Sequence, residues 1–398
     1  MRDTFDLVLA NGVVMTPGGA IETDIGVREG KVATFGRFDK DQTGDYIDCE
    51  GLHVLPGVVD SQVHFREPGL EYKEDLESGS RAAALGGVTA VFEMPNTEPT
   101  TTTPDMLDDK LARAANRMHT DHAFYVGATH GNVDLLPEME RMKGCCGVKV
   151  FMGASTGSLL VEDDEGVERV LNAISRRAAF HSEDEYRLAD RRSLAREGDW
   201  TSHPEVRDAE AAIMSTKRLL SLAEKTRKRI HVLHVTTAEE MEILGRHKAL
   251  ASVEATPQHM TLVAPQAYLE LKAYAQMNPP IREQRHVDAV MAAVNAGIVD
   301  VLGSDHAPHT KEDKEVGFDD APFGMIGLET ALGLTITELV DQKILSLPQM
   351  VQKLSTSPAR VIGLKNKGVI AEGYDAVKVD PIVYDHNGES SFDRTRLF

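Results

Sequence analysis

The sequence predicts an α/β protein, a (β/α)8 barrel of the TIM type with a small composite β module from its N- and C-terminal segments. Three observations carry this prediction. After residue 56, eight short apolar runs alternate with longer amphipathic segments, as in parallel βα units. Hairpin-like segments precede and follow that region. The 398 residues also leave room for a second module, because a barrel alone uses roughly 250.

The β module is expected to have two parts. Residues 1–55 contain short strand-like segments separated by Asn-Gly, Gly-Gly and Glu-Gly, which are dipeptides that favour tight hairpin turns. A helical stretch ends near Ile362, and residues 363–398 again have the pattern of strand and turn. We therefore expect a barrel over 56–362, with 1–55 and 363–398 meeting in one module beside it.

The eight apolar runs are the predicted barrel strands. They cover residues 57–65, 88–95, 122–129, 147–153, 177–183, 229–235, 250–257 and 299–306. A doubly wound open sheet is the competing fold, but its first strand would be expected to lead into a glycine-rich phosphate turn, and none is present. Segments 258–284 and 307–326 follow the last two strands and are rich in Pro, Gly, Asn and charged residues. They are the predicted active-site loops.

Composition and charge exclude several classes of protein. The formal net charge of -20 argues against nucleic acid or an anionic membrane as a partner, so an acidic substrate would need its own local cation. No apolar run reaches the roughly 20 residues of a membrane helix, and the N-terminus lacks a signal-peptide pattern. The odd number of cysteines, without CxxC spacing, argues against a disulfide framework and a zinc ribbon. We expect a cytoplasmic protein.

Metal-capable side chains lie within or at the ends of five different predicted strands. They are His64, Lys149, His181, His234 and Asp305. In a barrel, these positions face the mouth where βα loops build active sites. A single histidine in an apolar strand is more often a core residue than a ligand, but five such residues at corresponding positions favour a metal site.

Lys149 is the most specific of these signals. It lies inside the apolar run GVKVFMG, where burial would lower the pKa of the amine and leave it neutral. A neutral amine can react with carbon dioxide to form a carbamate, an anionic oxygen donor able to bridge two divalent cations. The alternative is a lysine whose charged end reaches solvent at the end of the strand.

Seven motifs then identify a family that the chain resembles over essentially its full length. They are PGVVDSQVHFREPG, EMPNTEP, GVKVFMG, AFHSEDE, HVLHVTT, MNPPIR and GSDHAPH. In order and spacing they are similar to those of dihydroorotases of the amidohydrolase superfamily. The resemblance implies one or two Zn²⁺ ions per chain. It makes carbamylated Lys149 the bridging ligand, with His64 and Asp305 on one metal and His181 and His234 on the other.

The resemblance also implies how the substrate is bound and converted. Arg66, Asn96 and His309 match residues that hold the substrate carboxylate, and Asn278 matches one that meets the pyrimidine ring. Asp305 would accept the proton of the attacking water during reversible hydrolysis of dihydroorotate to N-carbamoyl-L-aspartate, a step of pyrimidine synthesis. A homodimer or other homo-oligomer, and a partnership with aspartate transcarbamoylase, are further expectations. Without the motif, Arg66 could equally form a structural salt bridge with a neighbouring glutamate.

The sequence departs from the family pattern at three places. The usual HxH pair reads Gln62-Val63-His64, and a glutamine amide is a weaker donor than imidazole, so Gln62 is a doubtful ligand. The family usually continues with further strands beyond VDP, so the C-terminal part of the module is expected to be short. Phe323 and Ile326 stand where small residues and proline are common in relatives.

Two alternative functions remain open. A hydantoinase or allantoinase would share the barrel and the metal site, but its substrate would not require the cation of Arg66. A non-catalytic dihydroorotase-like partner of aspartate transcarbamoylase would explain Gln62. It would have no physical need for the five metal-capable side chains.

Overall fold

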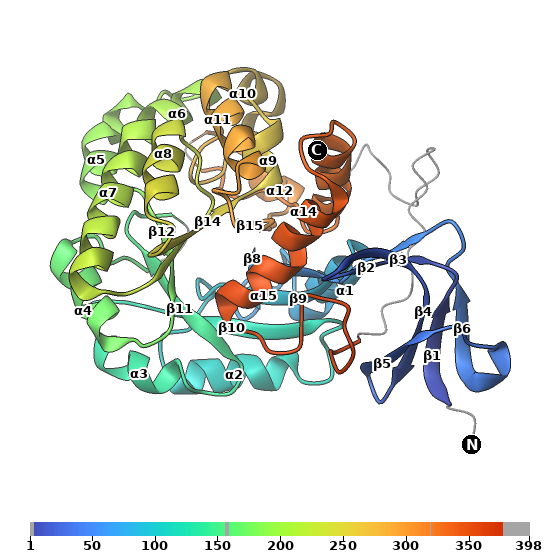
Figure 1. The fold of residues 1–398 in the computed structure, drawn as a ribbon. Helices are drawn as coiled ribbons and strands as arrows, with labels where there is room; N and C mark the ends of the chain where they lie inside the picture. Colours follow the sequence, from blue (N-terminus) through green and yellow to red (C-terminus); the bar gives the residue numbers. More distant parts are fainter. Residues whose placement is uncertain (1–3, 156–158, 319, 377–398) are drawn as a thin grey trace.

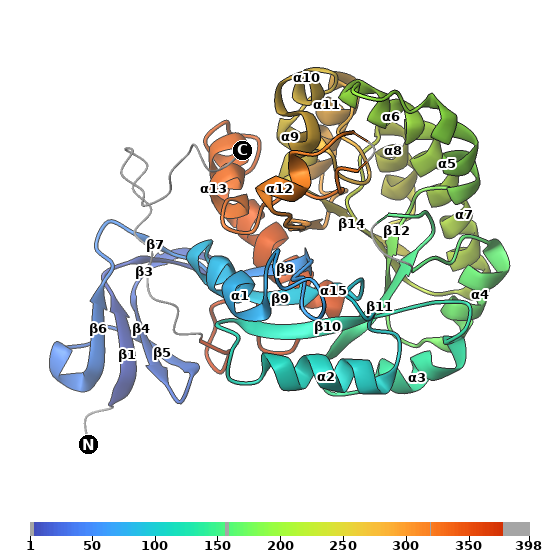
Figure 2. The ribbon, with the colours of Figure 1, turned by 180° about the vertical axis from the view of Figure 1, so that it is seen from behind.

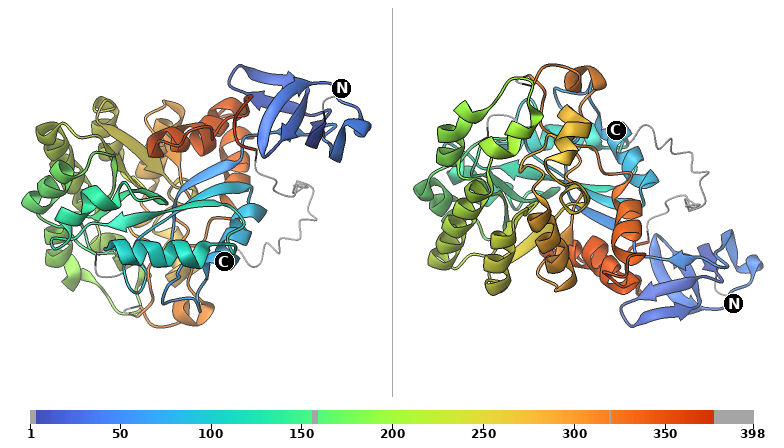
Figure 3. Two further views of the ribbon diagram at one scale, coloured as in Figure 1. Left: turned by 90° about the horizontal axis from the view of Figure 1, so that it is seen from below. Right: turned by 90° about the horizontal axis from the view of Figure 1, so that it is seen from above.

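The fold consists of a helix-covered barrel with a small β module to one side (Figures 1 and 2). The computed structural model describes residues 4–155, 159–318 and 320–376. The other views show the same arrangement, with the N-terminal strands beside the barrel (Figure 3). The predicted fold class, a (β/α)8 barrel with a β module, is confirmed.

Two small sheets form the module. One has the strand order β5-β4-β1-β6 and the other β3-β2-β7. The strands are β1 (Phe5–Ala10), β2 (Val13–Thr16), β3 (Gly19–Glu22), β4 (Asp24–Arg28), β5 (Lys31–Gly36), β6 (Thr43–Asp48) and β7 (His53–Val54). The turn between β4 and β5 contains Glu29 and Gly30, whose φ angles of 52° and 70° are the left-handed values that a tight hairpin requires.

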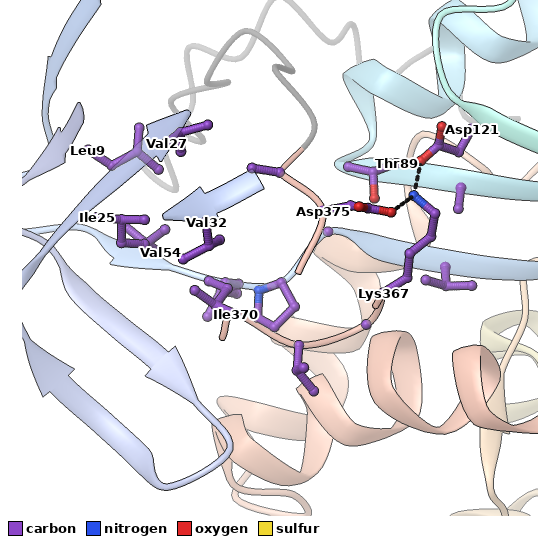
Figure 4. A pocket seen from close by; sticks show the side chains of 18 residues that line it. Leu9, Ile25, Val27, Val32, Val54, Thr89, Asp121, Lys367, Ile370 and Asp375 are labelled. Atoms are coloured by element: carbon purple, nitrogen blue, oxygen red, sulfur yellow. Dashed lines mark hydrogen bonds and ion pairs between the residues drawn. The ribbon is translucent and has the colours of Figure 1, made fainter. Parts of the chain in front are cut away.

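The C-terminal end of the described chain packs on this module. The backbone N–H of Val32 donates to Tyr374 O at 2.9 Å, and that of Ala376 donates to Gly30 O at 2.7 Å. Ile370 joins the apolar cluster of the module. Figure 4 shows Lys367 between Asp121, in the barrel, and Asp375, at nitrogen–oxygen distances of 2.5 and 2.9 Å. This stretch therefore links the module to the barrel, whereas residues 377–398 lie outside the described residues.

Eight parallel strands form the barrel in sequence order, β8 to β15. Their bounds are β8 (Val58–Val63), β9 (Val88–Glu93), β10 (Asp121–Gly127), β11 (Cys145–Phe151), β12 (Ala178–His181), β13 (Ile230–Val232), β14 (Ala251–Ala255) and β15 (Val301–Leu302). A parallel bridge between Val63 and His306, with the His64 N–H donating to His306 O at 2.7 Å, joins the last strand to the first. This closure excludes the doubly wound open sheet.

Each predicted run overlaps one strand, but every strand except β11 is shorter than its predicted run, and β13 and β15 are shortened most. The backbone turns out of the extended conformation soon after each of them, at His234 (φ 36°) and Asp305 (φ 47°). Left-handed φ values are uncommon for residues other than glycine and cluster at functional sites. The two shortest strands of the barrel therefore lead into two of the predicted metal-capable residues.

Helices cover the outside of the barrel (Figure 1). They are α1 (Leu76–Leu85), α2 (Pro104–Ala114), α3 (Leu136–Met139), α4 (Asp164–Ala173), α5 (Glu185–Arg191), α6 (His203–Val206), α7 (Ala209–Thr226), α8 (Ala238–Arg246), α9 (Pro257–Thr261), α10 (Gln266–Leu271), α11 (Gln284–Asn295), α12 (Lys311–Lys314), α13 (Ala331–Thr335), α14 (Leu347–Val351) and α15 (Ser357–Ile362). Side chains at the N-caps accept backbone N–H groups, as Asp75 does for α1 and Asp208 for α7. Within the described ranges, no helix combines the length and apolarity needed to cross a bilayer.

Candidate active site

A small polar cavity lies at the carboxyl ends of the barrel strands. Nine of the ten residues predicted from the sequence for the site line it, and they are Gln62, His64, Arg66, Asn96, Lys149, His181, His234, Asn278 and Asp305. The tenth, His309, contacts Arg66 from just outside the lining. Phe323 also lines the cavity, and its ring stacks on His203 with the ring centres 5.1 Å apart.

Two histidines, His181 at the end of β12 and His234 just after β13, converge on one point. Nδ1 of His181 lies 3.2 Å from Nε2 of His234. Two imidazole nitrogens that share one tetrahedral Zn²⁺ at about 2.0–2.1 Å each would lie about 3.3 Å apart. This pair therefore fits a single divalent cation. Both rings are buried, and burial lowers the pKa of each below its ordinary value, which favours the neutral, ligating form.

Lys149 stands in the barrel interior beside this pair. The residue is 1% exposed, and among the described residues its Nζ has no hydrogen-bond partner. The amine lies 4.5 Å from the centre of the Phe151 ring. Burial lowers the pKa of Lys149, although Asp305 and Glu254 oppose that shift. The alternative of a lysine reaching solvent is wrong, and the group is a buried, unpartnered amine.

His64, Asp305 and Gln62 form the other half of the cavity. Nε2 of His64 lies 3.3 Å from Oδ1 of Asp305, and Nδ1 of His64 lies 2.7 Å from Oδ1 of Asn96. The amide oxygen of Asn96 accepts Nδ1–H, which leaves Nε2 as the electron-pair donor. Gln62 places its Nε2 2.7 Å from the same Asp305 oxygen. Gln62 therefore presents an N–H group to Asp305, whereas a metal ligand would have to present a lone pair of electrons.

Arg66 supplies the local cation that the acidic chain requires. Arg66 is 2% exposed, and its Nε donates to Pro308 O at 3.0 Å. No carboxylate among the described residues forms an ion pair with it, which argues against the structural salt bridge. Burial lowers the pKa of Arg66 to about 10, so the group remains charged at neutral pH. A buried guanidinium without an anionic partner fits an anionic ligand.

A model of the amidohydrolase family matches residues 53–380 of the chain. The chain belongs to the amidohydrolase family. The family membership that the seven motifs predicted is therefore confirmed.

Curated relatives of this amidohydrolase are named dihydroorotases. The one from Methanosarcina acetivorans is 33% identical, over 90% of this chain and 80% of the relative. The one from Pelotomaculum thermopropionicum is 34% identical, over 98% and 94%. Similar solved structures include an L-hydantoinase (dihydropyrimidinase) from Arthrobacter aurescens, with a TM-score of 0.88 and 30% identity over 94% of this chain and 86% of that chain. A dihydropyrimidinase from Brevibacillus agri has a TM-score of 0.85 and 26% identity, over 93% and 84%.

The site of this amidohydrolase also contains a carboxylate that sequence reasoning missed. Oε2 of Glu183 lies 2.9 Å from Nε2 of His181, and Arg207 forms an ion pair with the same carboxylate. Glu183 therefore holds the His181 ring with Nδ1 directed toward His234, which is the usual arrangement behind a ligating histidine. Glu183 stands two residues after His181 in the motif HSEDE, and this proximity could have indicated its role.

A second group of possible metal ligands lies outside the barrel. His130, Glu162 and Asp163 place ligand atoms within 4.8 Å of one another. All three side chains are substantially exposed, and Asp163 also caps α4 by accepting the Gly166 N–H at 2.7 Å. This group is explained by helix capping and surface ion pairing, so the cavity remains the candidate active site.

Proposed function

We propose that this protein is a dihydroorotase, which hydrolyses dihydroorotate to N-carbamoyl-L-aspartate and catalyses the reverse cyclisation. The observation that carries the proposal is the presence of Arg66 in the cavity that holds His181, His234 and Lys149. The imidazoles and the amine suit a metal-dependent amide hydrolysis, and the buried guanidinium suits a ring carboxylate. The dihydroorotase relatives, at 33–34% identity, support the same substrate.

The proposed metal is Zn²⁺, held by His181, His234 and a carbamate formed from Lys149. The 3.2 Å separation of the two imidazole nitrogens and the unpartnered amine support this ligand set. A bound divalent cation would supply an acidified water and polarise the ring carbonyl. His64 and Asp305 are the proposed ligands of a second ion, and the amide of Gln62 weakens that half of the site.

Asp305 is the proposed proton carrier. It lies in the cavity on the left-handed turn after β15, and burial raises its carboxyl pKa above the ordinary value. A carboxylate with a raised pKa can accept a proton from the attacking water and return it to the leaving ring nitrogen. In the reverse direction the same group takes a proton from the ureido nitrogen as the ring closes.

Four residues are proposed to bind the substrate. Arg66, Asn96 and His309 would hold its carboxylate, and Asn278 would meet the pyrimidine ring. Oδ1 of Asn278 is buried and has no hydrogen-bond partner among the described residues, which supports a role as an acceptor for a ring N–H. Its Nδ2 lies 3.4 Å from Ser155 Oγ.

A hydantoinase is the second candidate function, favoured by the likeness to the Arthrobacter aurescens structure. Hydantoin and dihydrouracil contain the same cyclic amide without a carboxylate. Comparison of kcat/KM for dihydroorotate, dihydrouracil and a hydantoin by the purified protein separates the two functions. Dihydroorotate should be preferred by at least about tenfold, since one charge-assisted contact contributes that much.

A non-catalytic role beside aspartate transcarbamoylase is the remaining alternative, favoured by Gln62 alone. We propose that the protein is cytoplasmic, in keeping with its three free cysteines. We also propose that it forms a homo-oligomer. The proposed organisation has the β module in 1–55 and 363–398 and the barrel in 56–362. Absence of hydrolysis with every divalent cation, together with co-purification with aspartate transcarbamoylase, would support the non-catalytic role.

A further inference from the structure

The imidazole of His309 is surrounded by three polar groups, two from the segment between β8 and α1 and one from the segment after β15. Nζ of Lys73 lies 3.1 Å from its Nδ1. At the other side of the ring, Nε2 lies 3.1 Å from Nη2 of Arg66 and 3.0 Å from the carbonyl oxygen of Phe323. Lys73 and Arg66 can only donate hydrogen bonds, and the carbonyl can only accept one.

These contacts decide which nitrogen carries the proton. With the proton on Nε2, Lys73 donates to Nδ1 and Nε2–H donates to Phe323 O, so only the contact with Arg66 is unfavourable. With the proton on Nδ1, the contacts with Lys73 and Phe323 O both become unfavourable, and only Arg66 is satisfied. The neutral ring with Nε2–H is therefore the better match to its surroundings.

A doubly protonated ring is disfavoured in the same place. Burial and the positive charges of Arg66, Lys73 and Lys314 lower the pKa of His309 far below its ordinary value. Lys73 forms an ion pair with Asp313, in which Nζ lies 3.3 Å from Oδ2. The side chain of Lys73 is only 10% exposed, so its ammonium is held against the ring and not in bulk solvent.

In the tautomer with Nε2–H, two donors face each other without an acceptor between them. Nη2 of Arg66 and Nε2 of His309 are 3.1 Å apart, and this contact between two donors is unfavourable while no anion is bound. A carboxylate oxygen that accepts from both would relieve this contact. The pair then has the form of a carboxylate clamp, and its second donor depends on which tautomer His309 adopts.

We propose that Lys73 is a positioning residue for substrate recognition, which fixes His309 as the Nε2–H tautomer and so completes a carboxylate clamp with Arg66. That the bound anion is the carboxylate of dihydroorotate rests on the proposed function, whereas the assignment of the His309 tautomer is independent of it. Lys73 acts through His309 and does not line the cavity itself.

The first test observes the tautomer directly. Long-range ¹H–¹⁵N spectra of protein labelled at histidine distinguish protonated from unprotonated ring nitrogens, and comparison with His309→Gln assigns the signals of His309. The wild-type protein should have a protonated Nε2 and an unprotonated Nδ1. A wild-type His309 protonated at Nδ1 would overturn the proposal, whatever the substrate.

The second test removes the donor. Lys73→Met should give a mixture of tautomers, because Arg66 and Phe323 O then favour opposite forms. It should raise KM for dihydroorotate about tenfold, with kcat changed by less than about twofold and metal content unchanged. Lys73→Arg keeps a donor and should restore both the tautomer and KM. If Lys73→Met leaves the tautomer unchanged, Lys73 does not position His309, even if KM rises.

Two control variants separate positioning from general effects. Asp313→Asn removes the carboxylate beside Lys73 but keeps the contact with His309, so tautomer and KM should stay near wild type. Lys248→Met removes another partly buried lysine, one that pairs with Asp300 and does not line the cavity, and should change neither. If the wild type hydrolyses only carboxylate-free cyclic amides, the proposed function fails, but the tautomer result still decides the role of Lys73.

Discussion

The amide nitrogen of Gln62 lies 2.7 Å from Oδ1 of Asp305, the carboxylate that also faces His64. An ionised carboxylate attracts the N–H end of an amide, so the oxygen of Gln62 is turned away from Asp305. That oxygen has no hydrogen-bond partner among the described residues. In the half of the cavity that contains His64, the side chain of Gln62 is therefore held by a hydrogen bond to Asp305. In the other half, the ring nitrogens of His181 and His234 are spaced to bind a cation.

We predict that the purified protein binds fewer than two metals per chain and that Gln62→His raises this number toward two. Imidazole supplies the electron pair that the amide nitrogen lacks. Metal analysis after gel filtration measures the ratio, and Gln258→His, in a residue that does not line the cavity, is the control. Two chelator-resistant metals in the wild type would contradict the prediction.

Lys149→Ala should abolish hydrolysis and greatly reduce bound metal, because it removes the proposed carbamate ligand. Short-chain carboxylic acids should partly restore activity by occupying the vacated space. Lys353→Met is the matched control, since Lys353 is another buried lysine but donates to Val299 O and does not line the cavity. Near-normal turnover by Lys149→Ala would refute the carbamate assignment.

Arg66→Lys should lower kcat/KM for dihydroorotate roughly ten- to a hundredfold without loss of metal. Lysine retains the charge but cannot make a bidentate contact, and loss of one charge-assisted contact costs about 1.5 to 3 kcal/mol. Steady-state kinetics with dihydroorotate and dihydrouracil measure the effect. An equal loss for both substrates would show that Arg66 does not recognise the carboxylate.

Glu183→Gln should weaken metal binding about 10- to 100-fold, which is the usual effect of removing a carboxylate behind a ligating histidine. The amide keeps the shape of the side chain but loses its charge and its ion pair with Arg207. Competition with a chromogenic chelator measures the affinity, and Glu168→Gln, on the surface, is the control. Unchanged affinity would mean that His181 is oriented by other contacts.

The sequence was sufficient to predict the eight barrel strands, because each is a continuous apolar run that recurs at the spacing of a βα unit. Nine predicted residues line the cavity. Five of them were predicted because strand ends meet at one mouth in a barrel, and the other four came from the resemblance to dihydroorotases. It did not predict the Gln62–Asp305 hydrogen bond, since that contact joins residues 243 positions apart. The roles of Glu183 and Lys73 were missed for a similar reason, as each depends on side-chain orientation and not on strand pattern.

The most direct test of the account is the hydrolysis of dihydroorotate by the purified protein, measured beside dihydrouracil and a hydantoin on samples of known zinc content. We expect dihydroorotate to be hydrolysed with the highest kcat/KM, activity to rise with zinc content up to the first equivalent, and a chelator to abolish it. A protein that binds zinc but hydrolyses dihydrouracil or the hydantoin in preference to dihydroorotate would contradict the proposed function.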